Sequence, residues 1–196
     1  MIQDILYYLI LVLCLAFSLF KKKARQNYFW IYFLLVLLYE FFFEYRIVSV
    51  DFYASSALIY PLFFLNVYLI NFIKKIYILK VCLNSLLIGL GIYYLLKDKE
   101  YSINLGVLMV LTYILLSLLW FFNEFRKNDQ IHIIKKQFFW ISTSLLLWSV
   151  FFLFRLIPMY LFDKIDKEFL FTLNNIFQII TILSYIIFLK GLLCER

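Results

Sequence analysis

The sequence is poor in the residues that shape most soluble domains. Its 196 residues include 4 Gly, 2 Pro, 3 Cys and 1 His, and charged side chains make up 16% of the chain. Soluble domains are usually about 25% charged and about 45–50% apolar, whereas 66% of these residues are apolar. This composition excludes a soluble globular domain, a disordered chain and a disulfide-rich scaffold.

The scarcity of cysteine and histidine also excludes several kinds of site. Cys14, Cys82 and Cys194 are scattered and lie in or beside apolar runs, so we interpret them as small hydrophobic residues. His132 is the only histidine. A bis-histidine haem or a histidine-based metal site within one chain is therefore excluded, and we expect no cofactor.

Motifs for catalysis are missing as well. The chain has no glycine-rich phosphate loop, no HExxH, no G-x-S-x-G and no aspartate-rich metal motif. The last apolar segment, 169–189, has no lysine that could form a Schiff base with retinal. We therefore predict that this chain is not an enzyme.

Long apolar segments are what the sequence does contain. A bilayer core of about 30 Å requires roughly 20 helical residues. The runs lack the alternation of a membrane barrel, and a backbone in lipid must satisfy its hydrogen bonds within the segment. The sequence therefore predicts an all-α integral membrane protein, with 1–196 as a single transmembrane domain. Its seven helical spans are predicted at 2–20, 28–48, 52–72, 76–96, 103–122, 138–157 and 169–189.

Lysine and arginine alternate between the two sides of these spans. One side receives 13 cations and 3 acids, and the other receives 6 cations and 9 acids. Because cytoplasmic segments are enriched in Lys and Arg, the N-terminus is predicted outside and the C-terminus in the cytoplasm. We interpret the net charge of +7 as cytoplasmic cations that anchor the protein to anionic lipid headgroups. We expect no direct contact with nucleic acid.

Polar residues inside the spans are candidates for function, because intramembrane charge is costly. Glu40 and Glu44 share one face of the second span, and Arg155 has a predicted depth similar to that of Glu44. We hypothesise that Glu44, with Glu40 as the second candidate, faces the bundle and pairs with Arg155 or Arg46, with snorkelling to the outer headgroups as the alternative. Six amides are either interhelical hydrogen-bonding residues or a ligand cluster: Asn66, Asn71, Asn84, Asn174, Asn175 and Gln178. Gly89 and Gly91 indicate close helix approach.

Two segments of the chain are similar to each other. The sequence at 26–31, Gln-Asn-Tyr-Phe-Trp-Ile, is similar to Gln-Phe-Phe-Trp-Ile at 137–141, and lysines precede both. This indicates a parallel repeat of three helices on either side of a linking span. The resulting 3+1+3 plan, with asparagine in the third and seventh spans, resembles the SWEET sugar transporters. That family hinges on prolines in its first, second, fifth and sixth spans, whereas the prolines here are Pro61 and Pro158.

The composition, low in Gly and rich in Phe, Ile, Lys, Asn and Tyr, is typical of an AT-rich bacterial genome, so we expect a bacterial inner-membrane protein. From Phe138 onward, the runs Phe139-Trp140-Ile141 and Asn174-Asn175-Ile176 and the ending Gly-Leu-Leu-Cys resemble small seven-span proteins of Bacteroidetes. Similar modules there occur alone or as sensory halves of membrane kinases. The resemblance implies a sensing or scaffolding module.

Three functions follow from these observations. The first is a non-enzymatic sensor or scaffold that contacts a protein partner, or a second copy of itself, through its basic cytoplasmic face. The second is a small transporter or channel with a polar site between two three-helix halves. The third is a membrane-acting accessory of a bacterial defence system, such as those beside some CRISPR loci. The residues expected at the basic face are Lys21, Lys22, Lys23, Arg126, Lys127, Lys135 and Lys136.

Overall fold

The computed structural model describes residues 2–72, 77–97, 103–127, 132–162 and 167–194. These residues form helices and their links, with no strand among them. The elements are α1 (Ile2–Phe20), α2 (Lys22–Gln26), α3 (Phe29–Glu44), α4 (Val50–Ala54), α5 (Ser56–Phe72), α6 (Tyr77–Lys97), α7 (Ile103–Phe125), the 3₁₀ turn η1 (Ile133–Lys135), α8 (Gln137–Phe162) and α9 (Lys167–Leu193).

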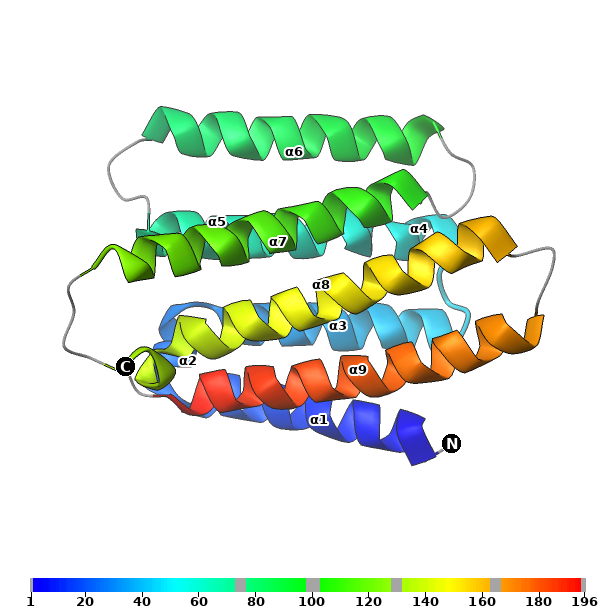
Figure 1. The fold of residues 1–196 in the computed structure, drawn as a ribbon, viewed down its shortest axis with the longest axis horizontal. Coiled ribbons are helices and arrows are strands. Elements are labelled where there is room, and N and C mark those ends of the chain that lie inside the picture. The colour runs from blue at the N-terminus through cyan, green and yellow to red at the C-terminus, as the bar shows by residue number, and fades with distance from the viewer. Residues whose placement is uncertain (1, 73–76, 98–102, 128–131, 163–166, 195–196) are drawn as a thin grey trace.

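The long helices lie side by side in one bundle, and successive helices run in opposite directions (Figure 1). Helix α6 lies along one edge of the bundle, and α1 lies with α9 along the opposite edge. The two ends of the chain are at opposite ends of the bundle. This arrangement follows from short links between apolar helices, which bring sequential neighbours together as antiparallel pairs.

Six helices of the described residues are long and apolar enough to cross a membrane. They cover Gln3–Phe20, Phe52–Phe72, Ile78–Lys97, Ile103–Phe125, Gln137–Leu156 and Glu168–Leu193. The chain is thus an all-helical protein with the character of a membrane protein. Six of the predicted spans correspond to these helices.

The predicted span at 28–48 differs from the other six, because its helix α3 has only 16 residues. At a rise of 1.5 Å per residue α3 is about 24 Å long. It begins after Tyr28, whose φ is 59°, and it is followed by Arg46, whose φ is 53°. These left-handed residues end the helical path at both sides. The chain then enters α4, where the Ser49 side chain accepts the Phe52 N–H.

The centre of the bundle is filled by aromatic rings. Phe33, Phe64 and Phe188 come from α3, α5 and α9, and their side chains are fully buried. The Phe188 ring lies 5.1 Å from the Phe33 ring and 5.5 Å from the Phe29 ring, both edge to face. Such geometry is favourable for aromatic pairs. The space between these three helices is therefore packed with aromatic side chains.

Helices α8 and α9 pack closely through small and polar residues. Ser142, Ser144 and Ser184 are buried, and the Ser144 hydroxyl donates to the Ser184 carbonyl at 2.7 Å. The Ser142 hydroxyl also lies 2.7 Å from the Tyr68 hydroxyl of α5. Small residues allow membrane helices to approach, and such hydrogen bonds link them.

Helix α6 contacts the bundle mainly through α5. Asn84 of α6 and Asn66 of α5 exchange two hydrogen bonds, at 3.0 and 3.3 Å. About two helical turns after Asn84, Gly91 lies so close to Leu58 that an added Cβ would overlap the leucine side chain. No atom lies within 4 Å of a Cβ built at Gly89. The expected close approach is therefore confirmed at Gly91 and is wrong at Gly89.

The contrast between these two glycines predicts different effects of the same substitution. We expect Gly91→Ala to destabilise the protein by about 1–3 kcal/mol, because the buried Leu58 must move out of its packed position. Gly89→Ala meets open space and should stay within about 0.5 kcal/mol. Unfolding in detergent titrated with dodecyl sulfate, followed by tryptophan fluorescence, measures both. Adding Leu58→Ala should make Gly91→Ala less costly, and equal effects at the two glycines would contradict this packing.

Candidate functional site at the basic end of the bundle

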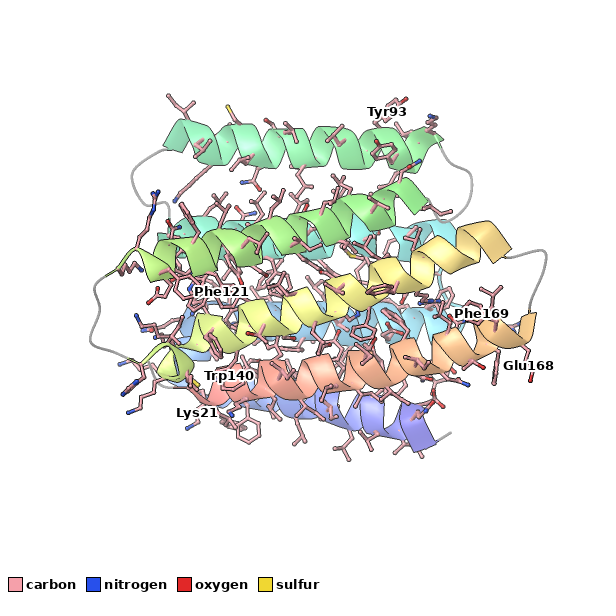
Figure 2. All side chains as sticks on the ribbon, in the orientation of Figure 1. Lys21, Tyr93, Phe121, Trp140, Glu168 and Phe169 are labelled. Carbon is pink, nitrogen blue, oxygen red and sulfur yellow. The ribbon has the colours of Figure 1, made fainter. Side chains whose placement is uncertain are left out.

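One end of the bundle, which we call the basic end, gathers cations from several links. Figure 2 shows Lys21 and Trp140 at this end, whereas Glu168 and Phe169 lie at the opposite end. The Lys190 ammonium of α9 lies 3.8 Å from the centre of the Trp140 ring. The described cations of the basic end are Lys21, Lys22, Lys23, Arg25, Arg126, Lys127, Lys135, Lys136 and Lys190.

A buried carboxylate holds two of these lysines. Glu124 lies in the last turn of α7, and its side chain is 6% exposed. Its Oε1 pairs with the Lys136 ammonium, and its Oε2 pairs with the Lys127 ammonium at 3.3 Å. The Lys136 side chain is 15% exposed and that of Lys127 is 53% exposed. Glu124 therefore joins the end of α7 to the segment that leads into α8.

Three amides, which we call the amide chain, connect further elements beside this ion pair. The Asn71 Nδ2 of α5 donates to the Asn27 Oδ1 at 3.1 Å. The Asn27 Nδ2, from the link between α2 and α3, donates to the Gln137 Oε1 at 2.8 Å. Gln137 is the first residue of α8 and is 1% exposed. The amide chain therefore joins α5, α3 and α8 at the basic end.

The orientation of the amide chain follows from one backbone carbonyl. The Asn71 Nδ2 also donates to the Val67 carbonyl at 2.8 Å, and a carbonyl can only accept. This fixes the Asn71 amide, which then fixes Asn27 and, through it, Gln137. Because the atom that faces Asn27 is the Gln137 Oε1, the other end of the carboxamide is Nε2, with its two N–H donors. No described residue accepts from this buried Nε2.

The ion pair and the amide chain border a common cavity, which we call the polar pocket. Its volume is about 350 Å³. Its wall combines three aromatic side chains with three lysines, one carboxylate and two amides. The lining residues are Lys23, Asn71, Phe72, Trp120, Glu124, Lys127, Lys136, Gln137 and Phe138.

Among the described residues, the wall of the polar pocket carries more positive than negative charge. Lys23, Lys127 and Lys136 line it together with the carboxylate of Glu124. Burial lowers the pKa of the Lys23 amine below its ordinary value, Cys194 opposes this shift, and the positive charge of Lys136 adds to it. Burial and Lys136 both disfavour the charged form of Lys23. A negative group in the polar pocket would oppose both.

The acidic residues of the predicted ion pair lie elsewhere, toward the opposite end. Glu40 is half-buried and accepts hydrogen bonds from Tyr53 at 3.0 Å and Tyr7 at 3.3 Å. Glu44 is exposed and lines a surface cavity of about 450 Å³ between α1 and α3. The Arg155 guanidinium of α8 lies 4.8 Å from the centre of the Phe177 ring. The predicted pairing of Arg155 with an acid of α3 stays a prediction.

The predicted amide cluster is divided between separate contacts. Asn66 is bonded to Asn84 on α6, whereas the Gln178 Nε2 on α9 donates to the Asp4 Oδ1 of α1 at 2.7 Å. Asn174 is exposed and Asn175 is half-buried on α9. Of the predicted amides, Asn71 lines the polar pocket, and the other five line neither of the two cavities described above. The structure thus uses Asn66 and Gln178 as links between helices.

The predicted basic-face residues fall into two groups. Lys23, Lys127 and Lys136 line the polar pocket. Lys22, Lys135 and Arg126 are exposed around it, with the Arg126 guanidinium 4.1 Å from the centre of the Phe122 ring, and Lys21 is half-buried.

Asn71 was among the predicted amides, whereas three residues of the site were not predicted as functional: Asn27, Glu124 and Gln137. A signal for two of them is present in the similar segments 26–31 and 137–141. Asn27 and Gln137 lie at the start of those segments, and they share a hydrogen bond. The two similar segments therefore lie at the starts of α3 and α8, which contact each other in the fold.

Comparisons with protein-family profiles, with curated proteins and with solved structures find no match for this chain.

Proposed function

We propose that this protein is a seven-span membrane protein, N-terminus outside and C-terminus cytoplasmic, that acts as a sensor or scaffold through its basic end. The observation that carries the proposal is the convergence on one pocket of lysines from two parts of the chain, between α1 and α3 and between α7 and α8. The same pocket also holds a buried carboxylate and buried amides. Cations that served only to anchor the protein to headgroups would need no such network, because snorkelling lysines reach headgroups singly.

The seventh span in this proposal is α3. Its length of about 24 Å is below the about 30 Å of a bilayer core, yet its exposed side chains include Leu34, Leu38 and Phe41. Its opposite face buries Phe33 and Val36 in the bundle. A helix with an apolar exposed face and an apolar buried face belongs in lipid. A short span is accommodated by local thinning of the bilayer or by its flanking residues.

The transport alternative receives less support. A transported polar substrate requires a polar passage between the helices near the middle of the membrane. In the described bundle, Phe64 lies halfway along α5, and its fully buried ring packs edge to face against those of Tyr113 and Phe188. Asn66 and Gln178, which the sequence offered as substrate ligands, are engaged with Asn84 and Asp4.

The proposed orientation predicts which end of the bundle is reachable from outside the cell. In a variant with its three cysteines replaced by serine, Ile47→Cys should react with a membrane-impermeant maleimide in intact cells, because Ile47 is 61% exposed at the opposite end. Lys22→Cys and Arg126→Cys, at the basic end, should react only after permeabilisation. The reverse pattern would contradict the orientation.

The same cysteine variants test the sensor or scaffold role. A cross-linker attached at Lys22→Cys or Arg126→Cys should capture one discrete partner, or a second copy of the chain, and the matched Ile47→Cys should not. Charge reversal by Lys135→Glu beside these positions should reduce the capture. Equal capture from both ends, or none from the basic end, would contradict the role.

A further inference from the structure

The polar pocket contains a hydrogen-bond donor that the fold itself leaves unused. The Gln137 side chain is held by the amide chain, with its Nε2 buried and without an acceptor among the described residues. A buried polar group without a partner costs about 1–3 kcal/mol. Gln137 is one of the residues that line the polar pocket, and an acceptor bound there within reach of its Nε2 would supply the missing hydrogen bond.

The lysines around this donor favour an acceptor with a negative charge. Lys23, Lys127 and Lys136 line the same pocket, and Glu124 is the carboxylate among its described lining residues. The Lys136 ammonium pairs with Glu124, and an ammonium has three N–H donors. An anion would gain from the lysines and from the Gln137 amide together.

The donors come from different elements, and their separate positions indicate the shape of the anion. Lys23 comes from α2, Lys136 from the residue before α8, and Gln137 from the first turn of α8. Donors from separate elements suit a group with several oxygens pointing in different directions, as a phosphate has. Phe72, Trp120 and Phe138 add apolar wall, which fits the uncharged part of a larger molecule. The volume of about 350 Å³ lies at the lower end of ligand pockets.

We propose that the polar pocket binds a phosphate group carried by an anionic ligand, with Lys23, Lys136 and the Gln137 carboxamide as its donors. This rests on the proposed function, because it names what the basic end recognises. Two sources carry such a group: an anionic lipid, whose phosphate lies at the depth of the basic end in the proposed topology, and a soluble phosphate compound. Basic pockets between membrane helices are known to hold lipid headgroups.

The variant Gln137→Glu tests the donor with little other change. A glutamate keeps an oxygen for the Asn27 Nδ2 and replaces only the unused Nε2 by a second oxygen, which repels an anion. Gln26→Glu is the matched control, because Gln26 is exposed at the same end and does not line the polar pocket. Lys23→Gln, with the exposed Lys22→Gln as its control, tests the pocket independently of Gln137.

The experiment uses the full chain in nanodiscs of phosphatidylcholine, titrated with inorganic phosphate, and in nanodiscs doped with phosphatidylglycerol. Tryptophan emission, to which Trp120 of the pocket wall contributes, reports binding, and native mass spectrometry counts retained phosphatidylglycerol. We expect saturable binding of at least one probe. Gln137→Glu and Lys23→Gln should weaken it about tenfold or more, whereas Gln26→Glu and Lys22→Gln should leave it nearly unchanged.

Each outcome decides one question. Binding of phosphate alone identifies a soluble ligand, and binding of phosphatidylglycerol alone identifies a lipid headgroup. The absence of saturable binding for both probes, or equal losses in the pocket variants and their controls, would overturn the site. If Gln137→Glu fails to fold, comparing probe binding by Lys23→Gln with that by Lys22→Gln still tests the site. Nanodiscs expose both ends of the protein, so a negative result here is distinct from a reversed topology in cells.

Discussion

Replacing Phe188 by alanine should destabilise the protein by about 3–5 kcal/mol. The Phe188 side chain is 2% exposed, and its ring contacts those of Phe29, Tyr32, Phe33 and Phe64 at centroid distances from 5.1 to 6.2 Å. Its removal leaves a cavity where α9 meets α3 and α5. The lost aromatic pairs, worth about 0.5–1.5 kcal/mol each, are part of this cost.

The unfolding free energy of Phe188→Ala, measured by dodecyl sulfate titration, should be compared with that of Phe171→Ala on the same helix. Phe171 is 67% exposed, so we expect its loss to cost no more than about 0.5 kcal/mol. Phe188→Leu keeps most of the volume and should cost under about 1.5 kcal/mol, which provides a measurement if the alanine variant does not fold. Similar losses for Phe188→Ala and Phe171→Ala would contradict a packed centre.

Glu124→Gln is expected to cost about 3 kcal/mol. The substitution conserves volume but removes the negative charge that faces the Lys136 ammonium, and both side chains are largely buried. Removing one member of a buried pair leaves the other charge in a poorly solvated place without this counter-charge. Lys127→Met should cost less than about 1 kcal/mol, because the Lys127 side chain is 53% exposed and exposed pairs contribute little.

A double-mutant cycle isolates the buried pair. Glu124→Gln combined with Lys136→Met removes both charges, so its cost should be well below the sum of the two single substitutions. The same unfolding titration provides all four free energies. Additive costs, or equal costs for Glu124→Gln and Lys127→Met, would show that the Glu124–Lys136 contact contributes no stability at the basic end.

The helices were largely predictable from hydropathy, whereas several of their ends were not. The first span was predicted at 2–20 and is the helix Ile2–Phe20, and the span predicted at 103–122 is Ile103–Phe125. The span predicted at 28–48 stops at Glu44, although the apolar sequence continues beyond it. Its end depends on backbone geometry at Tyr45 and Arg46, and hydropathy carries no information about such a turn.

The site was only partly predictable, because counting charges does not tell which way a side chain points. The alternation of cations identified Lys23, Lys127 and Lys136, but it treated Glu124 as an acid of the following link. The residues Ser117, Trp120 and Glu124 recur at helical spacing, and all three are buried. This stripe was the available sign that Glu124 belongs to the inner face of α7.

Depth along a helix limits the possible partners of a side chain but does not choose among them. Glu44 and Arg155 have similar predicted depths, and their ion pair stays a prediction. In the fold, Glu40 of α3 meets tyrosines from α1 and α4, and the Arg155 guanidinium lies against a ring of α9. The choice among neighbours at one depth depends on the order of helices around the bundle, which no single segment encodes.

The contact between α1 and α9 has a consequence for biosynthesis. The Cys14 thiol donates to the Tyr185 carbonyl at 3.7 Å, across a sequence separation of 171 residues, and the Tyr7 and Tyr185 rings are 5.9 Å apart. At about 5–20 residues per second, ribosomes need roughly 10 to 30 s to make that stretch. During this time the first helix is in the membrane without its last neighbour. The bundle therefore closes only when the final helix is released, and a nascent chain stalled earlier presents an unfilled groove beside α1.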